Sequence, residues 1–228
     1  MIEGKLIRKR KTMGGIMKLV GVVVIVLVGF GIWKLASAPE VPNEKASLLE
    51  ITEKDWVKGS ADAPVTLVEY TDFQCPACGA YYPLIKQLTE EFGDKVRVVI
   101  RHYPLIEIHK NALSGARAAE AAGRQGKFWE MYDILFSNQK EWSLAEDPMK
   151  SILPSYAGRI GLDMEKFRQD MADSSIDDKI NQDRRTGNDL EITGTPTFFL
   201  NGKKLENPRS IEEFKSLVQK GADAVSGK

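Results

Sequence analysis

Apolar residues are unevenly distributed along the chain, and their longest run lies near the N-terminus. Residues Ile16 to Leu35 are almost continuously apolar, with Lys18 and Lys34 interrupting the run near its two ends. About twenty helical residues span the ~30 Å hydrocarbon core of a bilayer. The run therefore predicts a single transmembrane helix over residues 16–35.

The charges on either side of this run predict its orientation. Basic residues are concentrated before it, at positions 5, 8, 9, 10 and 11, and are sparse just after it. The positive-inside rule then assigns residues 1–15 to the cytoplasm and the rest of the chain to the outside of the cell membrane. We expect a single-pass membrane protein whose main domain is extracytoplasmic.

Cleavage of the apolar segment is the alternative to a retained anchor. Ala36-Ser37-Ala38 matches the small-residue pattern that signal peptidase recognises. Pro39 would then become the first mature residue, which disfavours cleavage, and the run is longer than the ~7–15 residues of a secretory signal. We therefore expect a retained anchor followed by a proline-containing linker over residues 36–50.

The pattern after the linker changes to short strands and amphipathic helices. Val65 to Tyr70 and Val96 to Arg101 are rich in β-branched residues and read as buried strands. Between them, Ala80 to Phe92 reads as a helix that ends at Gly93. A strand, a helix and a second strand in this order predict a right-handed βαβ unit.

A helical pattern then continues from about residue 105 to residue 190, with apolar side chains at three- and four-residue spacing between Phe128 and Phe136. Strand character returns at Thr197 to Leu200, followed by the hairpin turn Asn201-Gly202 and a final helix. The pattern predicts one α/β domain over residues 51–228 with a helical insertion at about 105–190. Three acidic residues of the insertion, Asp177, Asp178 and Asp183, are expected on a solvated helix face.

Composition excludes one class of partner. The chain has 32 basic and 32 acidic residues and no net charge, so no broad basic surface for nucleic acid is expected. Its 2 cysteines, Cys75 and Cys78, are separated only by Pro76 and Ala77. They can pair only with each other or with another molecule, which makes them the main candidates for chemistry.

The location of the pair favours redox chemistry. It falls where a predicted strand leads into a helix N-terminus, where free N–H groups and the helix dipole stabilise a thiolate. Pro76 suits the first helical position, because an N–H at that position has no partner within the helix and proline loses nothing by lacking one. Cys78 lies three residues after Cys75 on the same helical face. Cys75 is then the nucleophile or the attacked sulfur, and Cys78 resolves the mixed disulfide.

Two structural interpretations compete with redox chemistry. A disulfide closing so short a loop stabilises a fold by roughly 2 kcal/mol at best, and a chain this long forms a large core without it. A structural zinc site needs four ligands. The chain offers no second cysteine pair, and His102 and His109 lie outside the usual ligand spacing. We therefore expect no metal.

The segment from Phe73 to Cys78 resembles the active site of the DsbA family, thioredoxin-fold thiol oxidases that act outside the cytoplasm. Gly194-Thr195-Pro196-Thr197 before a short apolar strand resembles the family's second landmark. The resemblance implies a cis peptide bond at Pro196, opposite the cysteines, and a Thr195 backbone that pairs with the substrate chain. By itself, the Thr195-Pro196 pair is also compatible with a simple strand start.

The resemblance also assigns a role to Glu69, six residues before Cys75. In the family, an acid at this position lies beneath the cysteines and assists proton transfer to the buried thiol. From the strand pattern alone, Glu69 shares a face with Leu67 and Thr71, and a strand glutamate is more often exposed to solvent. The sequence departs from the family at Ala77, where well-known members carry histidine, so we expect a weaker oxidant than those members.

These observations give a membrane-anchored thiol:disulfide oxidoreductase that oxidises reduced exported proteins through the Cys75–Cys78 disulfide. We expect a monomer without a separate cofactor. The resemblance implies reoxidation by a quinone-linked membrane partner. A reductase or isomerase of the same fold is the nearest alternative. A membrane-tethered chaperone or a copper(I)-binding module, in which soft thiolates bind the metal, is the alternative from another class.

Overall fold

The structure is a computed structural model that describes residues 43–225 and 227. The predicted cytoplasmic segment, the transmembrane helix over 16–35 and the first part of the linker lie outside the described residues. Within them, no helix combines the length and the apolar character needed to cross a bilayer. The fold below therefore concerns the predicted α/β domain.

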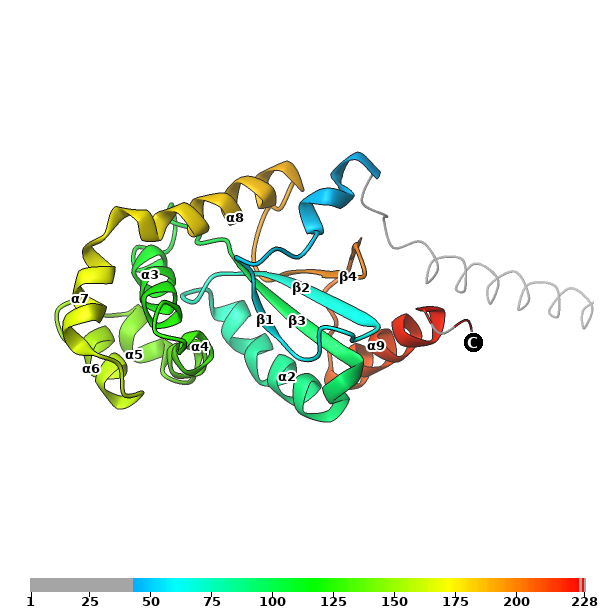
Figure 1. The fold of residues 1–228 in the computed structure, drawn as a ribbon, viewed down its shortest axis with the longest axis horizontal. Coiled ribbons are helices and arrows are strands. Elements are labelled where there is room, and N and C mark those ends of the chain that lie inside the picture. The colour runs from blue at the N-terminus through cyan, green and yellow to red at the C-terminus, as the bar shows by residue number, and fades with distance from the viewer. Residues whose placement is uncertain (1–42, 226, 228) are drawn as a thin grey trace, which may run out of the picture. The chain divides into compact units, whose positions relative to one another are not determined.

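A five-stranded mixed sheet forms the centre of this domain (Figure 1). Its spatial order is β1-β3-β2-β4-β5, in which β2 and β3 are parallel and the other neighbouring pairs are antiparallel. The strands are β1 (Trp56–Lys58), β2 (Val65–Thr71), β3 (Val96–His102), β4 (Thr197–Leu200) and β5 (Lys203–Lys204).

The predicted βαβ unit is confirmed. Helix α2 (Pro76–Phe92) connects β2 to β3 and begins four residues earlier than the pattern indicated. It ends at Gly93, whose φ of +37° lies in the left-handed region that favours glycine. A short 3₁₀ helix, η2 (Gly93–Lys95), leads into β3. Strand β1 is an addition to the predicted fold, because its three residues are too few to show a pattern.

Six α-helices follow β3 and precede β4, where the helical insertion was expected (Figure 1). Helices α3 to α7 gather at one end of the sheet, and α8 returns toward it. They are α3 (Ala112–Gly123), α4 (Phe128–Ser137), α5 (Gln139–Ser143), α6 (Ile152–Arg159), α7 (Met164–Ala172) and α8 (Asp177–Asp189), with a 3₁₀ turn η3 (Ser174–Ile176) before α8.

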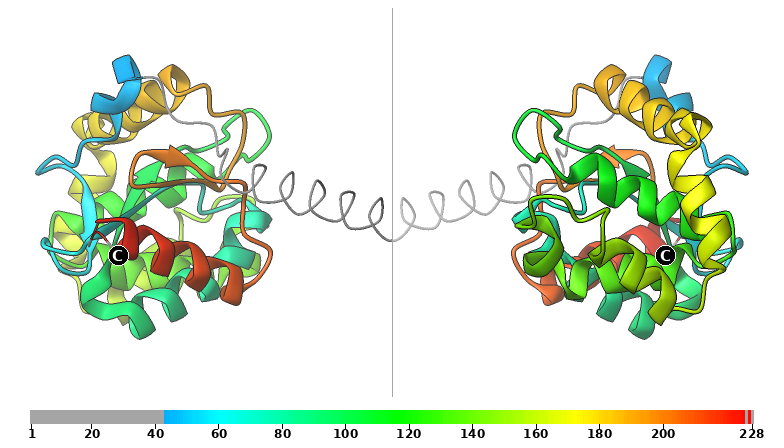
Figure 2. Two further views of the ribbon diagram at one scale, coloured as in Figure 1. Left: turned by 90° about the vertical axis from the view of Figure 1, so that its right-hand side faces the viewer. Right: turned by 90° about the vertical axis from the view of Figure 1, so that its left-hand side faces the viewer.

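Helices cover both faces of the sheet. Helices α2 and α9 (Ile211–Val225) lie on one side, and α8 with the 3₁₀ helix η1 (Asn43–Leu49) on the other (Figure 2). Successive side chains of β2 point to opposite faces of the sheet. Leu67 lies in the larger core beneath α2, and Val68 lies in the smaller core on the opposite face. Both faces of the central strands are therefore buried.

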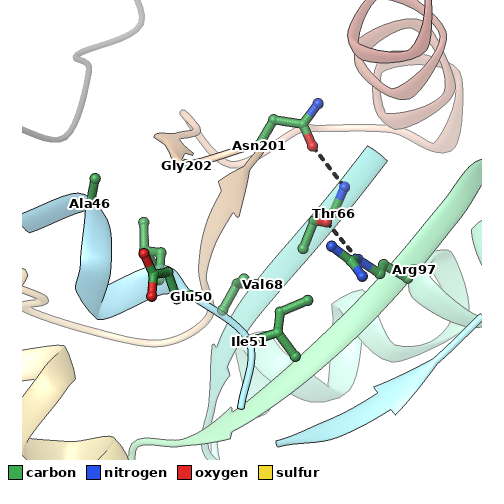
Figure 3. A pocket seen from close by; sticks show the side chains of 9 residues that line it. Ala46, Glu50, Ile51, Thr66, Val68, Arg97, Asn201 and Gly202 are labelled. Atoms are coloured by element: carbon green, nitrogen blue, oxygen red, sulfur yellow. Dashed lines mark hydrogen bonds between the residues drawn. The ribbon is translucent and has the colours of Figure 1, made fainter. Parts of the chain in front are cut away.

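An open cavity of about 520 Å³ remains on the second face, between η1 and the sheet (Figure 3). At its edge, Asn201 Oδ1 accepts a hydrogen bond from the Thr66 N–H at 2.7 Å, and Thr66 Oγ1 accepts one from Arg97 Nε at 2.8 Å. These bonds attach the β4–β5 hairpin and β3 to β2. None of the residues lining the cavity belongs to the cysteine motif.

The expectation for the acidic residues of α8 is wrong in part. Asp183 is only 3% exposed and accepts hydrogen bonds from the His102 N–H at 2.9 Å and from Lys179 Nζ at 2.6 Å. Asp177 forms a bidentate pair with Arg117. Asp183 therefore attaches α8 to β3, and Asp177 attaches α8 to α3. Local sequence cannot show these contacts because His102 and Arg117 are distant along the chain.

The packing of Trp142 within the insertion yields a stability prediction. Trp142 is fully buried, donates from Nε1 to the Leu135 carbonyl at 2.8 Å, and packs so closely on Gly115 that a Cβ there would lie 2.7 Å from its ring. We expect Trp142→Ala to lower the free energy of unfolding by about 3–5 kcal/mol, the cost of truncating a large aromatic side chain in a core.

Thermal and urea unfolding of the full-length protein measure this change. Leu144→Ala is the matched control, because Leu144 lies two residues away and is 80% exposed. The Leu144→Ala substitution should change the free energy of unfolding by no more than about 0.5 kcal/mol. Equal stability of the two variants would show that Trp142 does not hold the insertion in place.

Candidate active site

The two cysteines occupy the start of α2, as predicted. Cys75 is the N-cap residue, with φ −66° and ψ 122°, and Pro76 follows at the first helical position. The Cys75 N–H donates to the Asp72 carbonyl at 3.0 Å, which closes the turn between β2 and the helix. Cys75 is 7% exposed and Cys78 is fully buried, so only the first sulfur is within reach of another molecule.

The two thiols have opposite acid–base properties. The pKa of Cys75 falls from 9.0 to about 5, chiefly because the Cys78 thiol donates a hydrogen bond to its anion. Burial opposes this shift, whereas the N–H groups of Cys78 and Ala77 add to it, as expected at a helix N-terminus. The pKa of Cys78 is raised well above its ordinary value, first by burial and then by Cys75 and the charge of Glu69.

The Thr195–Pro196 peptide bond is cis, as the resemblance implied. It brings the Thr195 carbonyl to 3.4 Å from the Cys75 sulfur. The Thr195 hydroxyl contributes to the low pKa of Cys75 and makes no other hydrogen bond among the described residues. The loop is held in turn by Asn207, whose Nδ2 donates to the Pro196 carbonyl at 2.9 Å.

Glu69 lies beneath the motif, on the face of β2 that points toward α2. It is 1% exposed, and burial raises its pKa to about 7, an effect that the nearby Thr71 hydroxyl opposes only in part. Its charge acts on Cys78, so the two groups are close. The strand pattern alone favoured an exposed glutamate, which is wrong; the placement implied by the family resemblance agrees with the structure.

Two polar residues that the sequence did not indicate, Asp72 and Gln139, fix the motif segment. Asp72 Oδ1 accepts from the Gln74 N–H at 2.7 Å, and its Oδ2 accepts from the Leu105 N–H at 3.0 Å. Gln139, at the start of α5, donates from Nε2 to the carbonyls of Phe73 and Cys75, both at 2.8 Å. No local signal marks the longer contacts, because Leu105 lies 33 residues from Asp72 and Phe73 lies 66 residues from Gln139.

The two histidines have separate partners. His102 Nε2 lies 2.7 Å from Glu120 Oε1, and His109 Nδ1 lies 2.7 Å from Asp72 Oδ2. Within the part of the chain that the structure describes, no three histidine, cysteine or acidic side chains come together as metal ligands would. The site therefore offers one chemically distinctive feature, a pair of thiols with opposed pKa shifts.

The described domain therefore has a DsbA-like thioredoxin fold. Wolbachia pipientis α-DsbA1 superimposes with a TM-score of 0.72 at 22% identity, covering 80% of this chain and 98% of that protein. Oxidised BdbD from Bacillus subtilis superimposes with a TM-score of 0.67 at 22% identity, covering 75% and 94%. A family model described as thioredoxin matches residues 51–220, and the chain belongs to this family.

Curated relatives share the same segment within much longer proteins. The Na⁺/H⁺ antiporter NhaA 3 of Salinispora tropica is 42% identical over 166 residues, which are 73% of this chain and 24% of the antiporter. The antiporter NhaA of Herminiimonas arsenicoxydans is 34% identical over 193 residues, 82% of this chain and 30% of that protein. The matched segment thus spans less than a third of the length of these relatives.

The low pKa of Cys75 predicts a pH-dependent stability of the reduced protein. Because the folded pKa, about 5, lies below the ordinary 9.0, the anion stabilises the reduced fold fully above pH 9, and this stabilisation is lost as the pH falls toward 5. Cys78 has a raised pKa and stays protonated in the fold over this range. The oxidised protein has neither thiol. We expect the stability of the reduced form relative to the oxidised form to fall steadily from pH 9 to 5.

Urea unfolding of both forms across this range measures the difference, and the ultraviolet absorbance of the thiolate reports the pKa directly. Reduced Cys75→Ser is the control, because it retains Cys78 and Glu69 but lacks the ionising thiol. A difference between the two forms that does not change with pH would contradict the low pKa of Cys75.

Proposed function

We propose that this protein is a thiol:disulfide oxidoreductase that donates its Cys75–Cys78 disulfide to reduced proteins outside the cytoplasm. The observation that carries the proposal is the opposition of the two thiols, since a stabilised Cys75 thiolate favours the reduced form of the pair. A pair that is stable when reduced readily passes its disulfide to other thiols.

The surroundings of Cys75 support an unfolded polypeptide as the substrate. The side chains of Ile106, Ile108 and Leu144 are 39%, 73% and 80% exposed and lie in the two loops that flank the motif segment. Gln74 joins these loops, because its Nε2 donates to the Ser143 carbonyl and its Oε1 accepts from the Asn111 N–H. Exposed apolar side chains around a reactive sulfur suit the apolar segments of an unfolded chain.

The proposed exchange begins when a substrate thiolate attacks the Cys75 sulfur. The bond between the two motif sulfurs breaks, and Cys78 leaves and takes a proton. A second substrate thiolate then attacks the substrate sulfur of the mixed disulfide, and Cys75 leaves as a stable thiolate. The substrate has lost two electrons and the motif has gained them. A membrane partner linked to quinone would restore the motif disulfide.

The exchange reaction tests this proposal. Oxidised full-length protein should convert a reduced, unfolded polypeptide with two cysteines to its disulfide form. We expect Cys75→Ser and Cys78→Ser each to abolish this conversion, because neither variant can hold the motif disulfide, as gel electrophoresis after thiol trapping would show. Undiminished conversion by Cys75→Ser would end the proposal.

Equilibration with glutathione separates an oxidase from a reductase. Because Ala77 offers no positive charge, we expect a reduction potential between the ~−270 mV of thioredoxin and the ~−120 mV of the strongest DsbA oxidants. A value at or below that of thioredoxin would favour a reductase.

The proposed location is the outer side of the cell membrane, with residues 16–35 as a retained anchor. An antiporter works within a membrane, so the relatives support membrane attachment of this domain. We expect the full-length protein to remain in the membrane fraction after an alkaline wash. Protease added to intact protoplasts or spheroplasts should degrade its extracytoplasmic domain. Release by the wash, or a mature N-terminus at Pro39, would contradict the anchor.

A further inference from the structure

A row of buried polar groups continues beneath Cys78 and has no role in the exchange described so far. Among the described residues, four buried side-chain atoms on this side of the sheet make no well-formed hydrogen bond: Glu69 Oε2, Thr71 Oγ1, His102 Nδ1 and Tyr132 Oη. Buried polar atoms without partners are costly and rare in folded proteins. Their concentration under one thiol indicates a common purpose.

The four groups face the same space. Glu69 and Thr71 lie on one face of β2, and Thr71 is the direct neighbour of His102 in the parallel β2–β3 ladder. Tyr132 comes from α4 above them, and its pKa is raised first by burial and then by the charges of Glu69 and Cys78. The Phe73 ring borders the same space, with its centroid 6.0 Å from that of His102 and 5.8 Å from that of Tyr132.

The row has a second end on the solvent side of α3. His102 Nε2 lies 2.7 Å from Glu120 Oε1, which also accepts a hydrogen bond from Trp56 Nε1. Glu120 lines an open cavity of about 290 Å³ together with Trp56, Arg124 and Lys179. None of the residues lining this cavity belongs to the cysteine motif or to the Thr195–Pro196 loop. A substrate bound at Cys75 therefore leaves this opening free.

Histidine at the middle of the row suits the transfer of protons. A neutral imidazole that donates from Nε2 to a carboxylate keeps a lone pair on Nδ1, and it can accept a proton there while it gives one up at Nε2. In this protein the Nδ1 atom is the one without a partner. The ionisable groups in contact with His102 are Glu120 (α3), at its Nε2 atom, and Asp183 (α8), which accepts from its N–H at 2.9 Å. Glu69 (β2), Cys78 (α2) and Tyr132 (α4) act on one another at the other end of the row.

We propose that Thr71, His102 and Glu120 form a proton-transfer route that connects Glu69, beneath Cys78, with solvent in the cavity between β1, α3 and α8. The route deepens the proposed function and rests on it. The route requires bound water between the groups, and Glu69 Oε2, Thr71 Oγ1 and His102 Nδ1 each have a donor or an acceptor free to bind it. His102 and Glu120 do not touch the substrate and act through Glu69.

The route completes the proton balance of the exchange. When a substrate thiolate attacks Cys75, the Cys75–Cys78 bond breaks, and Cys78 leaves with the bonding electrons. Its raised pKa requires a proton, which Glu69 gives. Glu69 then regains a proton from solvent through Glu120 and His102. When the motif is reoxidised, Cys78 loses its proton and the same groups carry it outward. The electrons pass only between sulfur atoms.

Two variants of the full-length protein test the route. Glu120→Gln keeps the size of the side chain and its bond from Trp56 but does not readily take up a proton. His102→Phe keeps the ring contacts with Phe73 and Phe128, at 6.0 and 6.1 Å between centroids. The reaction is reduction of the motif disulfide by dithiothreitol and its reoxidation by the oxidised reagent, followed by stopped flow in H₂O and D₂O.

We expect both variants to slow the reaction roughly tenfold, with an altered solvent isotope effect, and Glu69→Gln to slow it by about a hundredfold or more. The forward and reverse rates should fall by the same factor, so that the equilibrium with glutathione is unchanged. A merely structural role would shift this equilibrium. Glu141→Gln is the matched control, because Glu141 also accepts from an aromatic side chain, the Tyr156 hydroxyl at 2.7 Å. It should react at the rate of the unmodified protein.

The outcomes separate the route from the function. If Glu69→Gln is slow while Glu120→Gln and His102→Phe react normally, the route is wrong and the proposed function stands. If the unmodified protein exchanges no disulfide, the function itself is wrong. Circular dichroism establishes folding, and Glu120→Gln alone decides the question if His102→Phe does not fold.

Discussion

The rest of the site depends on the different surroundings of two sulfur atoms on the first turn of one helix. Cys75 lies where the Cys78 thiol and free N–H groups stabilise its anion, and Cys78 lies one turn inward, where burial disfavours the anion. Helix geometry fixes both positions at once. The bond between the sulfurs therefore joins a good leaving group to a poor one. In the proposed exchange, this asymmetry explains why Cys78 requires an acid beneath it and why Cys75 requires none.

Each part of the fold contributes to this asymmetry. The parallel strands β2 and β3 direct α2 so that its N-terminus emerges beside the end of the sheet, and β2 also carries Glu69 beneath the helix. Strand β4 begins just after the cis bond and brings the Thr195 carbonyl against Cys75. The helical insertion closes the remaining side. The reactive sulfur is thus surrounded by three segments that are far apart in the sequence.

Much of this arrangement could be predicted from the sequence. β-Branched runs indicated β2 and β3, and the motif itself indicated the start of α2. The cis bond at Pro196 and the burial of Glu69 were accessible only through resemblance, because proline and glutamate have commoner roles in strands. Asp183 and Gln139 could not be assigned, since their partners lie 81 and 66 residues away. Polar residues act through such distant contacts, whereas apolar periodicity is a local signal.

The two hydrogen bonds from Gln139 have a consequence for how this site can change during evolution. Both are accepted by backbone carbonyls, of Phe73 and of Cys75, and neither depends on a side chain of the motif. The insertion thus fixes the path of the backbone while the residues between the cysteines remain open to substitution. Mutation at Ala77 can then retune the chemistry of the sulfurs without disturbing the frame that presents them. A rigid backbone frame with a variable dipeptide allows one fold to serve thiol:disulfide oxidoreductases of different reduction potential.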